Sequence, residues 1–150
     1  MAQGDSKQFY DYPLIAGNGG FNNSSDTFKV RFTASTYAAV AITGTNPNVS
    51  AHAAVTGGNF AGDVTLTSVT FTRTGAVTTL DAADLTTIAK NVSNPSTIRT
   101  MIVYNDTHAS DIMYCVYDLT TDGSTALDLV NNDFDFAFGA PGIMTGTADA

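Results

Sequence analysis

The sequence predicts an all-β fold: a single-domain antiparallel β-sandwich or barrel, of the jelly-roll or immunoglobulin-like kind, with an extended N-terminal arm. All fourteen acidic residues are Asp and only six residues are Lys or Arg, so the residues that usually fill exposed helix faces are scarce. Thr, Val, Tyr and Phe favour strands, and Asp, Asn and Gly favour turns. Short apolar runs recur every eight to twelve residues or so, separated by turn residues, which is typical of sandwiches and barrels.

Length and composition indicate one domain. The chain has 150 residues, 43% of them hydrophobic, which is enough to bury a core without disulfides or metals. Only 13% of the residues are charged, so Thr, Ser, Asn and Gly must form much of the surface. We therefore divide the chain into a flexible N-terminal arm at 1–25, a β-sandwich domain at 26–144 and a C-terminal tail at 145–150.

The arm contains a short apolar motif between polar stretches that are rich in Gly and Asn. Termini of this composition become ordered only when they are tied down. The motif therefore indicates docking on this domain, on a sister subunit or on another protein, with a loosely packed tail as the alternative. The residues expected to contact a partner are Phe9, Tyr10, Tyr12, Leu14 and Ile15.

The first part of the domain contains a clear strand at 27–33. Phe and Val alternate there with Thr, Lys and Arg, as in a strand with one buried face. A second strand is expected at 37–42, where Ala, Val and Ile predominate, and a turn at 43–48.

The middle of the chain shows a break in phase. The apolar alternation slips by one residue at Thr67–Ser68, which predicts a β-bulge, because the later side chains would otherwise face the wrong side of the sheet. Residues 72–76 are expected to close a turn. Residues 81–84 are expected to form a loop or bulge that feeds a strand through Ala89.

Two long apolar runs follow, at 98–104 and 112–119. Both have apolar residues on each face. This pattern predicts central strands, each face of which is covered by a second sheet or by a subunit. The intervening residues 105–111 would make the two runs a hairpin. A turn is expected at 120–124, where Asp is followed by Gly.

Near the C-terminus three Phe residues alternate with two Asp residues. In a strand Phe134, Phe136 and Phe138 share one face, and Asp133 and Asp135 share the other. Same-face neighbours are about 6–7 Å apart, close to the carboxylate separation of an inverting glycosidase. Because Trp is absent and nothing else suggests a sugar cleft, we predict that the Phe residues fill the core and that the Asp residues face solvent or a subunit.

Charge and hydropathy make nucleic acid and membrane unlikely partners, and we expect neither. The net charge of −8 and the pI of about 4.2 oppose binding to phosphate backbones, which requires clustered Lys and Arg. The N-terminus lacks the pattern of a signal peptide, and the chain has no apolar stretch of about eighteen residues.

Candidate metal-binding or nucleophilic residues are few. Cys115 is the only cysteine and lies in an apolar run, which predicts a buried structural thiol. His52 and His108 lie in separate predicted loops, where we expect them to be solvated. A calcium site could be built only from the acidic end of the chain, which consists of Asp118, Asp122, Asp128, Asp133 and Asp135. An EF-hand loop would need a Glu that this chain lacks, so we expect no metal, no cofactor and no enzymatic activity.

A series of short patterns points to a family. They are 26–30 (DTFKV), 69–72 (VTFT), 81–84 (DAAD), 102–107 (IVYNDT), 126–130 and a closing strand that ends at Gly142–Ile143. With these patterns the chain, chiefly over 63–139, resembles small all-β virion proteins of tailed bacteriophages that are encoded among the head and tail genes.

The resemblance implies a structural role in the virion, on the capsid surface. We expect a capsid decoration (cement) protein that binds and stabilises the shell of the major capsid protein as a homo-oligomer, a dimer or a trimer. The alternative is a tail or baseplate component, or a receptor-binding tip that presents the loop 105–111 to a cell-surface sugar. A third possibility is a small glycan-cleaving enzyme that uses Asp133 and Asp135.

Overall fold

The strands form three antiparallel sheets, which the computed structural model describes over residues 6–9, 22–41, 47–139 and 142–147. In this part of the chain every strand pair is antiparallel, and the one helical element is a single turn of 3-10 helix, η1 (Val49–Ala51). The prediction of an all-β antiparallel fold is confirmed.

The largest sheet has five strands. In spatial order they are β1 (Ser6–Gln8), β8 (Ile112–Asp118), β7 (Thr100–Asn105), β2 (Phe28–Thr33) and β3 (Val64–Thr65). A three-stranded sheet contains, in order, β10 (Met144–Thr147), β5 (Val77–Asp81) and β4 (Thr70–Thr74). A two-stranded sheet pairs β6 (Leu85–Ile88) with β9 (Phe134–Phe136).

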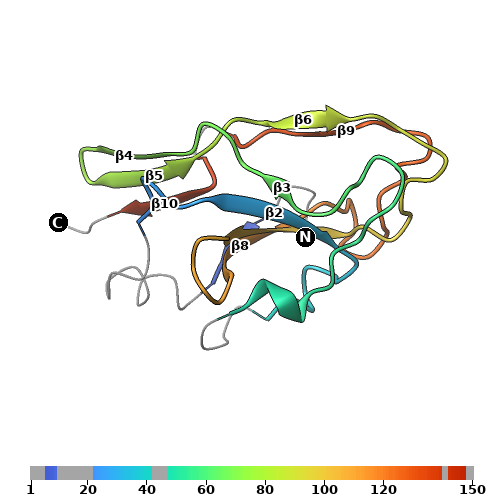
Figure 1. Ribbon diagram of the computed structural model, residues 1–150, viewed down its shortest axis with the longest axis horizontal. Helices are drawn as coiled ribbons and strands as arrows, with labels where there is room; N and C mark the ends of the chain where they lie inside the picture. Colours follow the sequence, from blue (N-terminus) through green and yellow to red (C-terminus); the bar gives the residue numbers. More distant parts are fainter. Residues whose placement is uncertain (1–5, 10–21, 42–46, 140–141, 148–150) are drawn as a thin grey trace.

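The arrangement of the sheets is consistent with a β-sandwich whose second layer is split. The two smaller sheets lie along one face of the five-stranded sheet, with β4 and β5 towards one end and β6 and β9 towards the other (Figure 1). A single cluster of buried side chains joins all three sheets, so the layers share one core.

The core between the layers is aromatic at its centre. Phe32 of β2 meets Phe60 and Phe134 edge to face, with ring centroids 5.2 and 5.3 Å apart. Leu80 of β5 is fully buried in the same cluster. Edge-to-face pairs of this kind contribute about 0.5–1.5 kcal/mol beyond the apolar area that they bury.

The strands β7 and β8 are buried on both faces, as predicted. Among the described residues, their second face is covered by Phe9 and by side chains of the segments 34–41 and 47–51. The cluster on this face consists of Phe9, Tyr37, Val40, Val49, Ile102, Tyr104, Met113 and Val116. The central strands therefore need no subunit to cover them.

The predicted strand at 37–42 is wrong over its described residues, 37–41, which form a turn. The backbone N–H groups of Ala39 and Val40 donate to the Thr36 carbonyl oxygen, and the Ala39 N–H also lies 3.3 Å from the Thr36 hydroxyl. A Thr side chain that bonds the following backbone favours a turn over a strand. The predicted turn at 43–48 lies largely outside the described residues.

The phase slip at Thr67–Ser68 marks a strand end, so the predicted bulge is wrong. The chain leaves the five-stranded sheet after Thr65 and enters the three-stranded sheet at Thr70. Ser68 has a positive φ of 52° between the two, a conformation that breaks a ladder. The apolar alternation changes phase because the chain changes sheet, so no extra residue within one strand is needed to explain it.

The bulge that does interrupt the main hairpin lies in β8. Val103 pairs with Cys115 and Tyr104 pairs with Met113, which leaves Tyr114 as the extra residue. Its ring is fully buried and packs edge to face on Phe28, with centroids 5.1 Å apart. The predicted hairpin of 98–104 with 112–119 is otherwise confirmed as β7 and β8.

Both ends of the chain contribute strands. β1 lies within the predicted arm and pairs with β8 along the edge of the five-stranded sheet. β10 crosses the predicted boundary at 144/145 and pairs with β5 from Met144 to Thr147. These short segments form strands because the edges of β8 and β5 are open to pairing. Their own composition does not indicate a strand.

Candidate functional site

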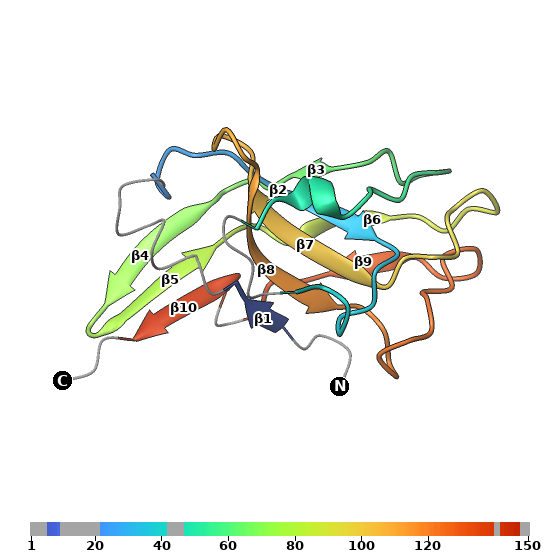
Figure 2. The ribbon, with the colours of Figure 1, turned by 90° about the horizontal axis from the view of Figure 1, so that it is seen from below.

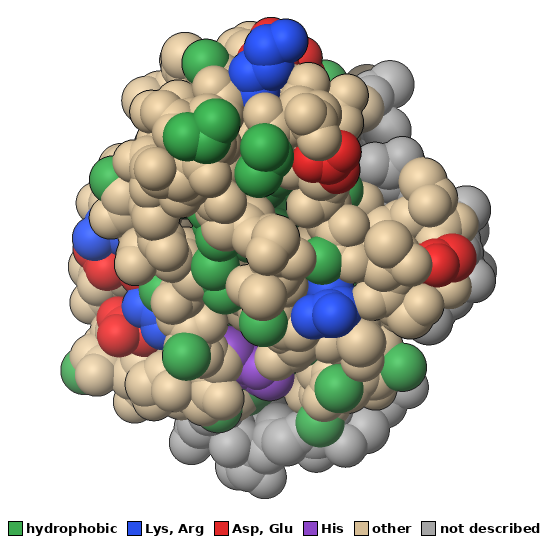
Figure 3. Space-filling model, turned by 90° about the vertical axis from the view of Figure 1, so that its right-hand side faces the viewer, with side chains coloured by type: hydrophobic (Ala, Val, Ile, Leu, Met, Phe, Trp, Pro, Cys, Tyr) green, Lys and Arg blue, Asp and Glu red, His purple; other side chains and the backbone are tan. Residues whose placement is uncertain are grey.

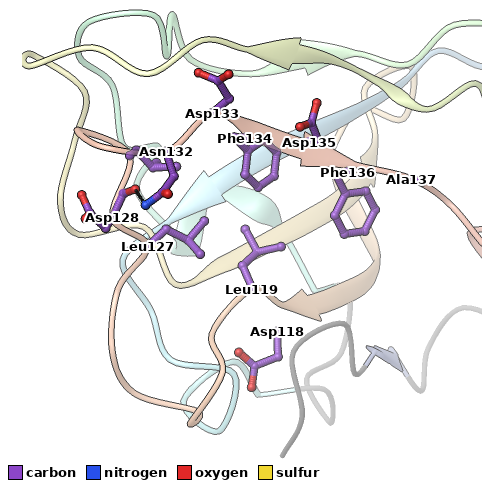
Figure 4. Close-up of a pocket in the computed structure, with 11 residues that line it drawn as sticks. Asp118, Leu119, Leu127, Asp128, Asn132, Asp133, Phe134, Asp135, Phe136 and Ala137 are labelled. Atoms are coloured by element: carbon purple, nitrogen blue, oxygen red, sulfur yellow. Dashed lines mark hydrogen bonds between the residues drawn. The ribbon is translucent and has the colours of Figure 1, made fainter.

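A hollow at the acidic end of the chain has a volume of about 530 Å³. It lies between the loop that follows β8 and the strand β9, and four of the five acidic residues considered above, all but Asp122, line it (Figure 4). Its lining residues are Asp118, Leu119, Leu127, Asp128, Leu129, Asn132, Asp133, Phe134, Asp135, Phe136 and Ala137.

Asp133 and Asp135 are exposed, as predicted, and both bond to the strand beside them. The Asp133 carboxylate accepts a hydrogen bond of 2.8 Å from the Lys90 backbone N–H. The Asp135 carboxylate accepts one from the Thr87 hydroxyl. In Figure 4 the two carboxylates point away from Phe134 and Phe136, which are turned inward. The pair therefore fastens β9 to β6 and its continuation.

Asp122, which lies outside the hollow, and Asp128, which lines it, organise the loop after β8. Hydrogen bonds from the Thr125 hydroxyl and from the backbone N–H groups of Thr125 and Ser124 hold the pKa of Asp122 below its usual range. A hydrogen bond from the Asn131 side chain likewise lowers the pKa of Asp128. Both are exposed carboxylates that cap turns.

Asp118 is fully buried at the end of β8. Its Oδ1 accepts hydrogen bonds from the Thr120 backbone N–H at 2.9 Å and from the Thr120 hydroxyl at 2.7 Å. Its Oδ2 has no partner within the described part of the chain. Figure 4 shows Asp118 apart from the other acids, with its carboxylate turned away from Asp133 and Asp135.

The carboxylates of this hollow thus diverge. Among the described residues, no three His, Cys or Asp side chains come together in a way that could hold a metal ion. Figure 3, which views the end of the molecule at the right of Figure 1, shows acidic side chains scattered among hydrophobic, basic and uncharged ones. The arrangement holds the loop and β9 in place, and it offers no convergent pair for acid–base chemistry.

A second hollow, of about 490 Å³, lies between β3 and β6. It borders a charged cluster that the sequence did not indicate. Asp63 accepts hydrogen bonds of 2.8 Å from Arg31 Nε and from the Tyr104 hydroxyl. Arg31 also donates to the Val49 carbonyl at 3.1 Å, so the cluster links β2, β7 and η1.

Electrostatics in this cluster favour the ionised Asp63. Burial pushes the pKa of Asp63 upward, but the hydrogen bonds from Arg31 and Tyr104 and the charge of Arg31 outweigh it, and the net pKa is lowered. The hydrogen bond to Asp63 raises the pKa of Arg31. Burial, followed by the hydrogen bond to Asp63, raises the pKa of Tyr104. All three groups keep their ordinary charge states near neutral pH.

The histidines lie in loops, as expected, but both are half-buried. His52 Nδ1 lies 3.2 Å from the Ser35 hydroxyl, and burial, followed by the nearby charge of Arg31, lowers the pKa of His52. His108 Nδ1 accepts a hydrogen bond from the Ser110 backbone N–H. His52 thus contacts a second loop at Ser35, and His108 bonds within its own loop.

Cys115 is a buried thiol, as predicted. Burial raises its pKa to about 12, and its Sγ lies 3.9 Å from the Ile143 carbonyl oxygen. A thiol of this kind is protonated and inaccessible near neutral pH.

Of the five motif residues expected to contact a partner, only Phe9 lies in the described part of the chain. Phe9 is fully buried in the cluster on the second face of the sheet, so it docks on its own domain and presents no free surface. Tyr10, Tyr12, Leu14 and Ile15 lie outside the described residues.

The flanks of the motif share one attachment point. The Phe9 backbone N–H donates to the Tyr114 carbonyl oxygen at 3.0 Å, and the Tyr114 hydroxyl donates to the Asn23 side chain. Phe9 and Asn23, which lie on either side of 10–21 in the sequence, are therefore both bonded to Tyr114 in the bulge of β8.

The other distinctive surface is the hairpin of β4 and β5. All five residues of β4 are exposed, and the two-residue loop uses Gly75 at a φ of 61°. Tight hairpin loops of this length need a positive φ, which Gly adopts without strain. The sequence predicted a turn here but not the strand β5 or the exposed edge.

No protein-family model, curated protein or solved structure matches this chain. Within the described residues, no helix is long and apolar enough to cross a membrane. Function is therefore inferred from the residues and their geometry.

Proposed function

We propose that this chain is a non-enzymatic structural protein of a bacteriophage virion: a capsid decoration (cement) protein that binds the shell of the major capsid protein. The observation that carries the proposal is that Phe9, the first residue of the apolar motif, and Asn23, beyond its end, both bond to Tyr114. The residues between these two points in the sequence include Tyr10, Tyr12, Leu14 and Ile15. Aromatic anchors on a fixed framework are typical of protein interfaces.

The acidic hollow supports a binding role over a catalytic one. Asp133 and Asp135 are engaged in hydrogen bonds to the neighbouring strand, and Asp122 and Asp128 are engaged in turns. A glycosidase would need one carboxyl with a raised pKa facing a second across a cleft. The pKa values of Asp122 and Asp128 are instead lowered.

In physical terms the protein would act by multivalent binding. Each copy contributes a modest apolar contact, and many copies on one shell oppose its expansion together. Symmetric oligomers are the commonest form of soluble assemblies, so a dimer or trimer on the shell is the expected state. The acidic surface keeps unbound copies soluble.

Substitutions within the motif test this proposal. Deleting residues 1–15 would also remove β1 and Phe9, so it would confuse unfolding with lost binding. We therefore choose the triple variant Tyr10→Ser, Tyr12→Ser, Leu14→Ser, which leaves β1 intact, with Val92→Ser as the exposed control.

The wild type and the control should co-sediment with shells assembled from the major capsid protein. The triple variant should remain in the supernatant while it keeps the wild-type melting temperature. Undiminished binding of the triple variant would show that the motif is not the contact.

The alternative role, in the tail or at a receptor-binding tip, is favoured by one feature. The loop 105–111 is preformed: the side chain of the buried Asn105 accepts hydrogen bonds from the backbone N–H groups of Thr107 and His108. Such a loop could present polar groups to a sugar. This role predicts only a few copies per particle and binding to host cells that is lost when the loop is replaced.

A further inference from the structure

The strand β4 is an unprotected sheet edge. It is the outer strand of the three-stranded sheet, and all five of its residues are exposed. Figure 2 shows it on the side of that sheet away from β10. The other edge strands of the described structure are shorter, with two to four residues each. Proteins normally shield long edges with Pro, Lys, bulges or covering loops. The register of β4 with β5 is continuous, so no bulge interrupts this edge.

The hairpin geometry determines which groups of β4 face outward. Thr74 and Val77 flank a two-residue loop, so they form a hydrogen-bonded pair, and the pairs alternate from there. Thr72 therefore bonds to Thr79 of β5. The backbone N–H and C=O groups of Phe71 and Arg73 point away from β5, towards the open edge.

These outward groups are self-complementary about Thr72. If a second β4 pairs antiparallel across a twofold axis at Thr72, Phe71 lies opposite Arg73 of the second copy, and Arg73 lies opposite Phe71 of the second copy. Each such pair can exchange both N–H···O bonds. The side chains of each pair then lie on the same face, where an Arg beside an aromatic ring is favourable.

Charge also favours a second copy at this edge. The chain has a net charge of −8, yet Arg73 is the only charged residue between Asp63 and Asp81. Two copies of this acidic protein can therefore approach each other through the hairpin without bringing their carboxylates face to face. The exposed apolar side chain of Phe71, at 43% exposure, would be partly covered.

We infer that β4 pairs with β4 of a second copy of this chain, which joins two three-stranded sheets into one continuous sheet across a twofold axis at Thr72. The pairing deepens the proposed homo-oligomer by naming its surface, but it does not require attachment to a capsid. A single strand pair buries less than the roughly 1,600 Å² of a standard interface, so the dimer forms at high protein concentration, as on a crowded shell.

Disulfide trapping tests the register. Thr72 would face its own copy across the axis, at a separation of about 4.5–5.5 Å between Cβ atoms, whereas Thr70 would face Thr74. Thr72→Cys should therefore form a disulfide-linked dimer under mild oxidation, and Thr70→Cys should not. The native Cys115 is buried and does not interfere. A monomeric Thr72→Cys, or equal trapping of Thr70→Cys, would overturn the inference.

Charge reversal at the axis provides a second test without a crosslink. Thr72→Lys alone and Thr72→Asp alone should each dimerise about fivefold more weakly than the wild type, because like charges oppose each other. An equimolar mixture of the two should dimerise at least as well as the wild type in sedimentation velocity. The same pair at the exposed Thr86 of β6 is the control. Equal behaviour of the single variants and the mixture would contradict pairing at Thr72.

Discussion

At the scale of single residues, Asp63 joins strands that are distant in the sequence. Its carboxylate accepts hydrogen bonds from Arg31 and Tyr104, and its pKa is lowered in the folded state. A carboxyl with a depressed folded pKa stabilises the fold above its unfolded pKa of about 3.9, and that contribution is lost as the pH falls through the folded pKa. The cluster is thus one source of acid sensitivity.

We predict that Asp63→Asn lowers the free energy of unfolding by about 1.5–3 kcal/mol at pH 7, because it weakens charge-assisted hydrogen bonds in a partly buried site. Urea unfolding at pH 7 and below pH 4 checks this, and the difference from the wild type should shrink at the lower pH. Asp106→Asn, which removes the more exposed ion pair with Lys29, should change the free energy by less than about 1 kcal/mol. A larger loss of stability for Asp106→Asn than for Asp63→Asn would contradict the prediction that the Asp63 cluster contributes more.

The single thiol gives a second prediction at this scale. Cys115 is buried and its pKa is raised to about 12, so it should be protonated and shielded in the native protein at pH 8. A thiol reagent such as DTNB should react at least about 100-fold more slowly with native than with urea-unfolded protein. Rapid modification of the native protein would show that the core around β8 opens readily.

At the scale of elements, the N-terminal strand belongs to the folded domain. Phe9 is fully buried against side chains from β7 and β8, and β1 supplies hydrogen bonds to the edge of β8. Phe9→Ala should therefore lower the free energy of unfolding by about 3–5 kcal/mol. Val92→Ala, at a side chain that is 86% exposed, should change it by no more than about 0.5 kcal/mol. Wild-type stability of Phe9→Ala in denaturant unfolding would place Phe9 outside the core.

The accuracy of the sequence predictions at this scale depends on periodicity. The alternating run in β2 and the continuous apolar runs of β7 and β8 have strong patterns, and each is found where it was predicted. The Ala-rich segment near Val40 has apolar residues without alternation, and hydrogen bonds to Thr36 make it a turn. β1 and β10 have weak patterns, because their pairing depends on edges that other parts of the chain provide.

At the scale of the whole molecule, contacts between segments that are distant in the sequence could not be predicted. Asp63 lies 32 positions from Arg31 and 41 from Tyr104, and no local pattern links them. The exposed Asp133 and Asp135 could be predicted because a strand alternates strictly. Their bonds to Lys90 and Thr87 could not, because they depend on how β6 and β9 meet.

The proposals use two different parts of the molecule, the exposed edge strand β4 and the motif residues that follow Phe9. In the proposed assembly the motif contacts the shell and β4 contacts a second copy. The two functions are separable, because the motif follows β1 and β4 belongs to another sheet. Variants at Thr72 should therefore change self-association while leaving shell binding by each copy intact.

The copy number of this protein relative to the major capsid protein tests the central claim most directly. It can be measured by quantitative mass spectrometry of purified particles of the bacteriophage to which the proposal assigns the protein. A decoration protein predicts a ratio near one or a simple fraction of it, since binding sites repeat with the symmetry of the shell. A handful of copies per particle, or absence from the particle, would contradict a role as a decoration protein.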